Sequence, residues 1–144
     1  MRKQTTQQIA PKIYISHSAS DNILAHKIRN LLKSGFNANI FMNEDLSGGE
    51  EWEPQLRRAL SDSDYVVVLL TPQSIRSTFV LLDLGAAWGL GKPIICIVTQ
   101  RNLWHTVTVP LNESQVIEVT DIDDPASSDE LARRFSEIIE SHPV

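Results

Sequence analysis

The chain has 144 residues, of which 42% are hydrophobic and 22% are charged. This length and composition are those of one ordinary globular domain, and they exclude a disordered, collagen-like or low-complexity chain. The formal net charge of −5 argues against a nucleic-acid partner, because binding to the phosphate backbone favours a basic surface.

Apolar runs in the sequence are short. The longest, Tyr65 to Leu70, is far below the roughly 20 residues that a membrane-spanning helix needs, so we expect no membrane segment. Residues 1–12 are predominantly polar, so we expect no secretory leader. The single Cys96 cannot form an internal disulfide, which suits a reducing compartment. We therefore expect a cytoplasmic protein in which Cys96 is a small buried apolar residue.

Strand-like and helix-like segments alternate along the chain after a flexible lead-in at residues 1–11. The predicted strands are residues 12–16, 38–42, 64–71, 93–98 and 116–119. The predicted helices follow Ser18, begin near Trp52, and span residues 77–90 and 128–139. This alternation predicts an α/β fold, a flavodoxin-like three-layer sandwich around a five-stranded parallel sheet of order 2-1-3-4-5.

Local signals support individual elements of this prediction. Ser18 followed by Asp21 is typical of a helix start, and Gly35 is placed to end that helix. The uninterrupted apolar run of residues 65–70 is typical of a central parallel strand that is covered on both faces.

In a sheet of this order, ligands bind beyond the carboxyl ends of the strands, where the strand order reverses. Here that crevice lies between the first and third strands. We expect its rim to contain Ser16, His17, Ser18, the polar loop of residues 43–51, and Thr71 onward.

One acidic residue falls within an apolar helix. Phe79, Asp83, Ala86, Ala87 and Leu90 form a single stripe at helical spacing, so Asp83 is predicted to point inward. A buried carboxylate is costly unless it is paired or hydrogen-bonded. Asp83 is therefore either a structural residue that bonds to its neighbours or a functional carboxylate that stabilises positive charge on a sugar ring.

The segment of residues 85–92 is not a phosphate-binding loop, because its spacing is wrong and a helix precedes it. We expect its glycines to end the helix and to let it pack closely on the sheet, with Lys92 as a helix-end charge. The four histidines are scattered, so no metal site is expected. Trp52 and Trp88 are predicted to be core residues, and Trp104 a candidate for an interaction surface.

Several segments, in their order and spacing, resemble a bacterial Toll/interleukin-1 receptor (TIR) domain. They are Ile13–Ser18 with Asp21, Glu44–Gly49, Trp52 with Arg58–Leu60 and Ser63–Asp64, Val66–Ser74, and Gly85–Trp88 with Gly91–Ile94. The Glu44–Gly49 segment resembles the BB loop of that family. The resemblance implies a single TIR domain over residues 12–144.

Membership of this family implies two modes of action. Many TIR domains signal by self-association through the BB loop, and many bacterial and plant members cleave the nicotinamide–ribose bond of NAD⁺. The enzymes use a glutamate in a W-x-x-x-E motif, which aligns here with Phe79 to Asp83. Both marked residues differ in this chain, and the aspartate is one methylene shorter. A displacement of that size can cost on the order of 100-fold in rate.

These observations together predict an NAD⁺-cleaving TIR domain in bacterial defence signalling that depends on self-association. NAD⁺ is its substrate, with no cofactor and no metal, and other TIR domains are its partners, with a homo-oligomer as the active form. The expected catalytic residue is Asp83; the substrate-binding residues are Ser16, His17, Ser18, Asn43, Asp45 and Phe79; the self-association loop is Leu46, Ser47, Gly48 and Gly49. The alternative is a non-enzymatic TIR–TIR interaction or scaffold module with a degraded active site.

Overall fold

Five parallel strands form the single sheet at the centre of this computed structural model, which describes residues 10–45 and 52–141. The strands are β1 (Lys12–Ser16), β2 (Asn39–Met42), β3 (Tyr65–Leu70), β4 (Ile94–Val98) and β5 (Val116–Glu118). Their order is β2-β1-β3-β4-β5, which confirms the predicted fold and topology. The predicted self-association loop, Leu46 to Gly49, lies outside the described residues.

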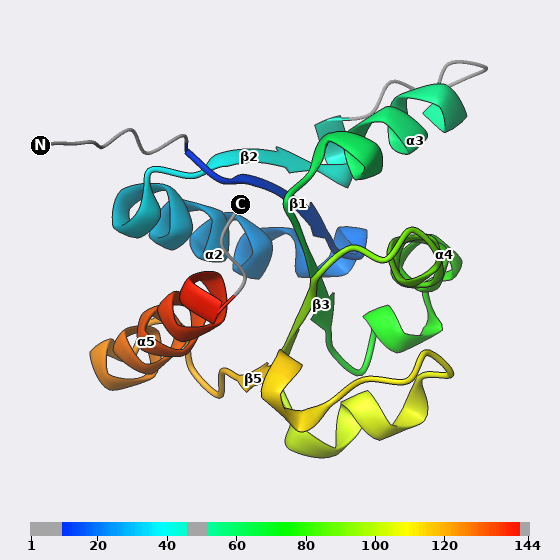
Figure 1. Cartoon of the computed structure of the whole chain (residues 1–144). Coiled ribbons are helices and arrows are strands. Elements are labelled where there is room, and N and C mark those ends of the chain that lie inside the picture. The colour runs from blue at the N-terminus through cyan, green and yellow to red at the C-terminus, as the bar shows by residue number, and fades with distance from the viewer. Residues whose placement is uncertain (1–9, 46–51, 142–144) are drawn as a thin grey trace, which may run out of the picture.

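Four α-helices cover the two faces of this sheet. They are α2 (Asn22–Phe36), α3 (Trp52–Asp62), α4 (Thr78–Gly89) and α5 (Pro125–Ser141). Helices α2 and α5 lie on one face, and α3 and α4 lie on the other (Figure 1). Short 3-10 turns join the elements, including η2 (Asn43–Asp45) after β2. Within the described ranges, no helix is both long enough and apolar enough to cross a membrane.

Successive strand residues divide the core into two halves, because side chains alternate between the faces of a sheet. Ile13 and Ile15 of β1 pack with Leu32 of α2 and Phe135 of α5. Tyr14, which lies between the two isoleucines, packs on the opposite face beneath α3 and α4. All six residues of β3 are buried, as expected for a central strand. Cys96 is also buried, as predicted.

Two helix ends differ from the prediction. Helix α2 continues past Gly35, and Asn37 supplies the left-handed residue at its end, with φ of 52°. Gly91 plays this role after α4, with φ of 71°, which confirms that a glycine of residues 85–92 ends that helix. Lys92 does neutralise a helix end, but the helix is α3: its Nζ donates to the carbonyl oxygens of Ser61 and Ser63 at 2.8 and 2.9 Å.

The predicted inward stripe of α4 is partly right, and its third inward member, Ala86, is partly buried against the core. Asp83 and Ala87 are buried as expected, but Phe79 is 58% exposed, and Trp88 and Leu90 are 55% and 53% exposed. Val80 and Leu84 face the sheet in their place. Helix α4 is apolar on nearly every side, so its hydrophobic pattern did not indicate which side would be buried.

The expectations for the glycines and tryptophans were also partly wrong. Gly85 and Gly89 do not approach the sheet, because a Cβ built on either would meet no atom within 4 Å. Trp104 is partly buried against the core beneath α4, with its ring 4.0 Å from that of His105. Trp52 packs partly buried against the same core, close to its predicted role.

Candidate functional site

The helix that carries the candidate acid has a defined start. Ser77 Oγ accepts the backbone N–H of Val80 at 3.3 Å, which satisfies one donor of the first turn. Asp83 follows on the face that also buries Leu84 and Ala87. Its carboxylate is therefore directed at the sheet beneath α4.

The Asp83 carboxylate is bound by two hydroxyl groups of β1. Ser16 Oγ donates to Asp83 Oδ2 at 2.6 Å, and the Tyr14 hydroxyl donates to the same oxygen at 3.1 Å. Asp83 is 2% exposed, and its two partners are fully buried. The sequence placed Ser16 and Asp83 at the same crevice but missed Tyr14. Two-residue periodicity was the available signal, because it puts Tyr14 and Ser16 on one face of the strand.

Burial and hydrogen bonding act on this carboxylate in opposite directions. Burial raises the pKa of Asp83 to about 6, although the hydrogen bonds from Ser16 and Tyr14 lower it. The carboxyl group of Asp83 is therefore mostly ionised at neutral pH and becomes protonated in mild acid. Burial and the nearby Asp83 charge raise the pKa of Tyr14, so its hydroxyl keeps its proton and remains a donor.

The end of β1 is joined to the end of β2 by one amide side chain. Asn43 Oδ1 accepts the backbone N–H of His17 at 3.0 Å, and Asn43 Nδ2 donates to the carbonyl of His17 at 3.0 Å. The backbone N–H and the backbone C=O of His17 are thus both hydrogen-bonded to the side chain of Asn43. The structure brings together these two predicted site residues, but Asn43 serves the backbone here.

Glu44 lies between two imidazole rings. Its Oε1 is 3.0 Å from His17 Nε2, and its Oε2 is 2.8 Å from His26 Nε2. The contact to His17 has the length of an ion pair without the alignment of a hydrogen bond. His17 is 3% exposed, so its side chain is largely out of reach of a ligand in this conformation. Glu44 belongs to the polar loop that the sequence placed on the rim of the crevice, whereas sequence reasoning did not identify His26 as a neighbour of the site.

Asp21 connects the loops after β1 and β3. Its Oδ2 accepts hydrogen bonds from Ser18 Oγ at 2.7 Å and from Thr71 Oγ1 at 2.6 Å. Ser18 does precede a helical turn, but its side chain does not cap the backbone of that turn. The Ser18–Asp21 spacing thus marked a local side-chain hydrogen bond after β1, and the bond from Thr71 to Asp21 connects that segment to the loop after β3.

Two of the predicted substrate-binding residues lie apart from Asp83. Asp45 Oδ2 accepts the backbone N–H of Met42 at 2.8 Å, so this carboxylate closes the turn after β2. The Phe79 ring contacts Trp52 of α3 edge to face, with ring centroids 5.7 Å apart. Phe79 therefore forms part of the outer surface between α3 and α4.

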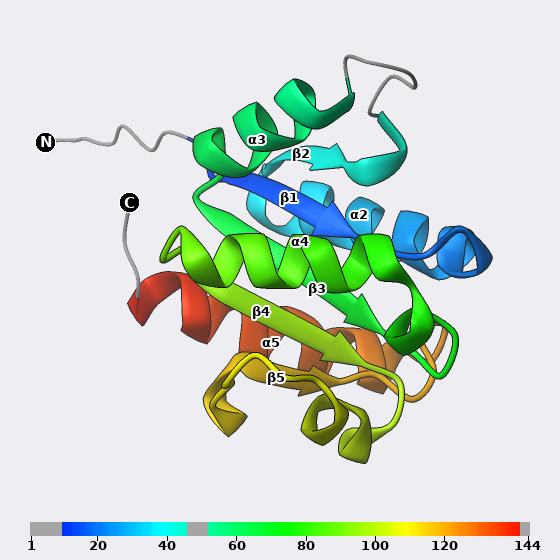
Figure 2. The ribbon, with the colours of Figure 1, turned by 90° about the vertical axis from the view of Figure 1, so that its right-hand side faces the viewer.

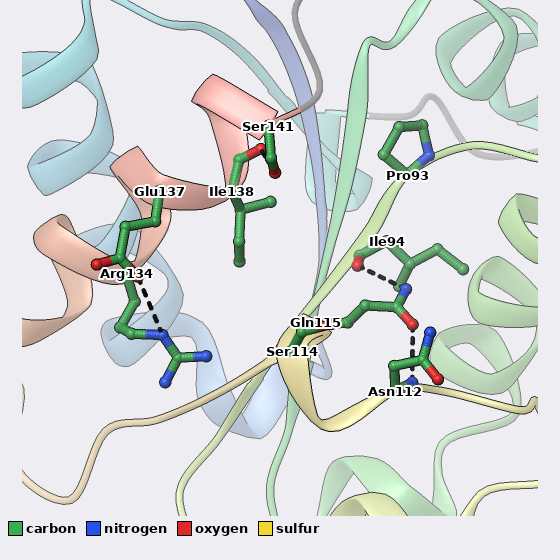
Figure 3. Close-up of a pocket in the computed structure, with 9 residues that line it drawn as sticks. All are labelled: Pro93, Ile94, Asn112, Ser114, Gln115, Arg134, Glu137, Ile138 and Ser141. Atoms are coloured by element: carbon green, nitrogen blue, oxygen red, sulfur yellow. Dashed lines mark hydrogen bonds and ion pairs between the residues drawn. The ribbon is translucent and has the colours of Figure 1, made fainter.

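Two cavities formed by described residues do not have Asp83 in their lining. One of about 430 Å³ is bounded by the end of α5, the turn before β5 and the start of β4 (Figure 3). Another, of about 540 Å³, is the groove between α3 and α4. Asp83 lines neither of them. Among the described residues, no cluster of three or more His, Cys, Asp or Glu side chains is arranged to hold a metal ion.

A doubly wound five-stranded sheet with polar loops at the carboxyl ends of β1 and β3 defines a domain of the flavodoxin-like class. The family profile described as the TIR domain matches residues 13–136. The chain therefore belongs to the TIR-domain family.

Solved structures agree with this assignment at the level of the fold. The TIR domain of a Toll-related receptor from Hydra magnipapillata is 22% identical, with a TM-score of 0.59 over 88% of this chain and 96% of that chain. A 2-desoxiribosyltransferase from Leishmania mexicana is 17% identical, with a TM-score of 0.54 over 92% and 99% of the two chains. A CMP N-glycosidase from Clostridium botulinum is 13% identical, with a TM-score of 0.54 over 88% and 98%. Curated protein sequences gave no significant match.

Proposed function

We propose that this TIR domain binds NAD⁺ at the carboxyl ends of β1 and β3 and cleaves its nicotinamide–ribose bond. The observation that carries the proposal is the Asp83 carboxylate, which is buried and held by Ser16 and Tyr14 beside the end of β1. A carboxylate in such a water-poor place stabilises a nearby positive charge more strongly than one in water.

In the proposed reaction, the Asp83 carboxylate acts while the nicotinamide–ribose bond breaks. The bond between the ribose anomeric carbon and the nicotinamide nitrogen breaks, and nicotinamide leaves with the electron pair. The ribose carries positive charge in an oxocarbenium-like state, which the Asp83 carboxylate opposes. Attack by water gives ADP-ribose and one proton, whereas attack by an adenine nitrogen gives a cyclic ADP-ribose and likewise releases one proton. Two proteins that share the fold are named as a 2-desoxiribosyltransferase and a CMP N-glycosidase.

Access to Asp83 and the setting of the reaction form part of the same proposal. Because Asp83 is 2% exposed, the ribose must displace neighbouring groups to reach it. Ser16, His17, Ser18 and Asn43 surround that approach. We further propose that the domain acts in the cytoplasm, in bacterial defence, as a homo-oligomer that assembles with other TIR domains.

The direct experiment measures nicotinamide release from NAD⁺ by concentrated protein. We expect release by the parent chain and a loss of at least about 100-fold in Asp83→Ala, since the stabilising charge is gone. The matched control is Asp129→Ala, which removes an exposed acid on α5 and should leave the rate unchanged. No release by the parent, or full activity of Asp83→Ala, would contradict the proposal.

A specific observation also favours the second function, a non-enzymatic TIR–TIR interaction module. Asp83 is enclosed by the hydroxyls of Ser16 and Tyr14, as a structural carboxylate would be. If the parent protein assembles normally and releases no nicotinamide, this second function is the correct one.

A further inference from the structure

The outward side of α4 carries an unusual concentration of exposed apolar side chains. In the part of the chain that the structure describes, six large hydrophobic side chains are exposed, and five of them belong to α4 or to the residue after it. These five are Phe79, Leu81, Leu82, Trp88 and Leu90, with exposed fractions of 39% to 58%. Figure 2 shows α4 in front of the sheet with its outer side toward the viewer and uncovered by any described element. A helix that is apolar on every side is normally buried on every side.

A groove runs along one side of this surface. It has a volume of about 540 Å³, and its walls come from α3 and α4, including Leu56, Leu82 and Leu90. The charged residues on its rim, Glu53 and Arg57, pair with each other at 2.9 Å. Among the residues that the structure describes, the groove therefore presents apolar walls and no unpaired rim charge to an incoming group.

Two glycines lie at the centre of the outward side. Gly85 and Gly89 are four residues apart and so stand on one line along the helix. An added Cβ at either position would meet nothing within 4 Å, so no contact inside the chain requires a glycine there. Glycine within a helix is less stable than alanine. A close approach by another backbone is a reason for glycine at such positions.

The apolar surface has the size that pairing of two copies requires. About half of each of the five side chains is exposed. With a full area of roughly 200 Å² each, they present roughly 500 Å² of apolar surface. Two copies would then bury about 1,000 Å² in total before the rim is counted, which is where specific interfaces begin. The one charged residue of α4, Asp83, faces inward, so like charges would not oppose each other across the contact.

We propose that the outward side of α4 pairs with the same surface of a second copy of this chain, about a two-fold axis near Gly85. In such a contact the same patch on both copies must be self-complementary. The surface meets this condition because Leu81 and Trp88 protrude on one side of Gly85 and the groove lies on the other. Each copy inserts Trp88 into the other's groove, and the helices cross at the glycines. This contact lies outside the self-association loop and on the opposite side of α4 from Asp83.

The first test measures the oligomeric state against protein concentration by sedimentation, without NAD⁺. We expect a reversible dimer whose dissociation constant rises at least about 30-fold in Trp88→Glu, since a central aromatic anchor is replaced by a charge. Gly85→Leu should weaken the dimer similarly, whereas thermal melting should show it folded, because a Cβ added at this position meets no atom within 4 Å and the helix face there is open. Ile23→Glu changes the sixth exposed hydrophobic, away from α4, and should leave dissociation unchanged.

The second test locates the axis with a disulfide. Cys96 is buried, so Gly85→Cys adds the accessible thiol and should give a covalent dimer on mild oxidation. Ile23→Cys should still dimerise but should give no covalent dimer under the same conditions, because residue 23 lies away from the contact. A parent chain that stays monomeric at all concentrations, a dimer that Trp88→Glu does not weaken, or binding of the monomer to lipid vesicles through these side chains would each overturn the proposal. None of these readouts depends on nicotinamide release, so failure here is distinct from failure of the proposed reaction.

Discussion

Ser16 Oγ lies 2.6 Å from Asp83 Oδ2, so the last residue of β1 holds the acid of α4 by a short hydrogen bond. The Tyr14 hydroxyl approaches the same oxygen from two residues earlier in the strand. The side chain of Asp83 and the hydroxyl groups of Tyr14 and Ser16 thus bridge the space between α4 and β1. The chain departs from the family motif with a shorter acid, and the strand beneath supplies partners at the matching distance.

The rate of nicotinamide release should depend on pH through Asp83. The pKa of this carboxyl is about 6, so below that pH the group becomes neutral and activity should fall about tenfold per pH unit. The hydrogen bond from Ser16 lowers this pKa, so Ser16→Ala should move the acidic limb of the profile to higher pH. A pH–rate profile of both proteins measures the shift. Ser34→Ala, on the exposed side of α2, should keep the parent profile, and an unmoved limb in Ser16→Ala would contradict the assignment.

Stability should depend on pH in the opposite sense to that of an ion-paired aspartate. The folded-state pKa of Asp83 is raised from 3.8 to about 6, so the folded protein binds this proton first as pH falls. Relative to Asp83→Asn, the parent should therefore gain about 2 kcal/mol between pH 7 and pH 4, at 1.36 kcal/mol per pKa unit. Urea unfolding at several pH values measures the difference. Parallel curves for the two proteins would mean that the carboxyl is solvated.

Asp83→Glu should not restore the family's glutamate function. The extra methylene pushes the carboxylate against Ser16 and Tyr14, and overpacking of this kind costs about 1–3 kcal/mol. We expect a lower free energy of unfolding and no gain in nicotinamide release. Adding Ser16→Ala to Asp83→Glu removes the Oγ atom that the longer side chain would contact, and the double variant should recover part of the lost stability. A single Asp83→Glu variant as stable as the parent would show that the carboxylate can turn away from β1.

Asn43→Ala should destabilise the protein although it removes a half-exposed side chain. The change leaves the N–H and C=O of His17 without their partners, at a cost of about 2 kcal/mol. Chemical denaturation gives the free energy of unfolding. Asn30→Ala, on the exposed side of α2, should stay within about 0.5 kcal/mol of the parent. Equal effects of the two changes would argue against a stabilising role for the hydrogen bonds between Asn43 and the His17 backbone.

The sheet was predictable because its signals are local and repeated. The apolar run of β3 and the alternation of strand and helix fix the strand order with little ambiguity. The buried side of α4 was not predictable in the same way. Phe79 and Trp88 are as apolar as Val80 and Leu84, so periodicity within α4 could not choose between them. The choice depends on how α4 docks over β1, β3 and β4.

The sequence predicted several residues of the candidate site, but it did not predict the hydrogen bonds that they form. Asp83 and Ser16 were identified, because one is an acid in an apolar helix and the other ends a strand. The contacts of Asn43 with the His17 backbone and of Thr71 with Asp21 join loops that are far apart in sequence. Such contacts depend on the relative placement of whole elements, which no short motif encodes.

The partners of Asp83 also bear on how the chain folds. Tyr14 and Ser16 lie 69 and 67 residues before it, so their hydrogen bonds close a loop of nearly half the chain. Loops of this length close late, after the intervening strands have found their places. A nascent chain with β1, α2 and β2 complete therefore still lacks the acid, and the site comes into being only when α4 docks. We therefore expect a partly folded chain, in which α4 has not yet docked on the sheet, to lack the candidate site.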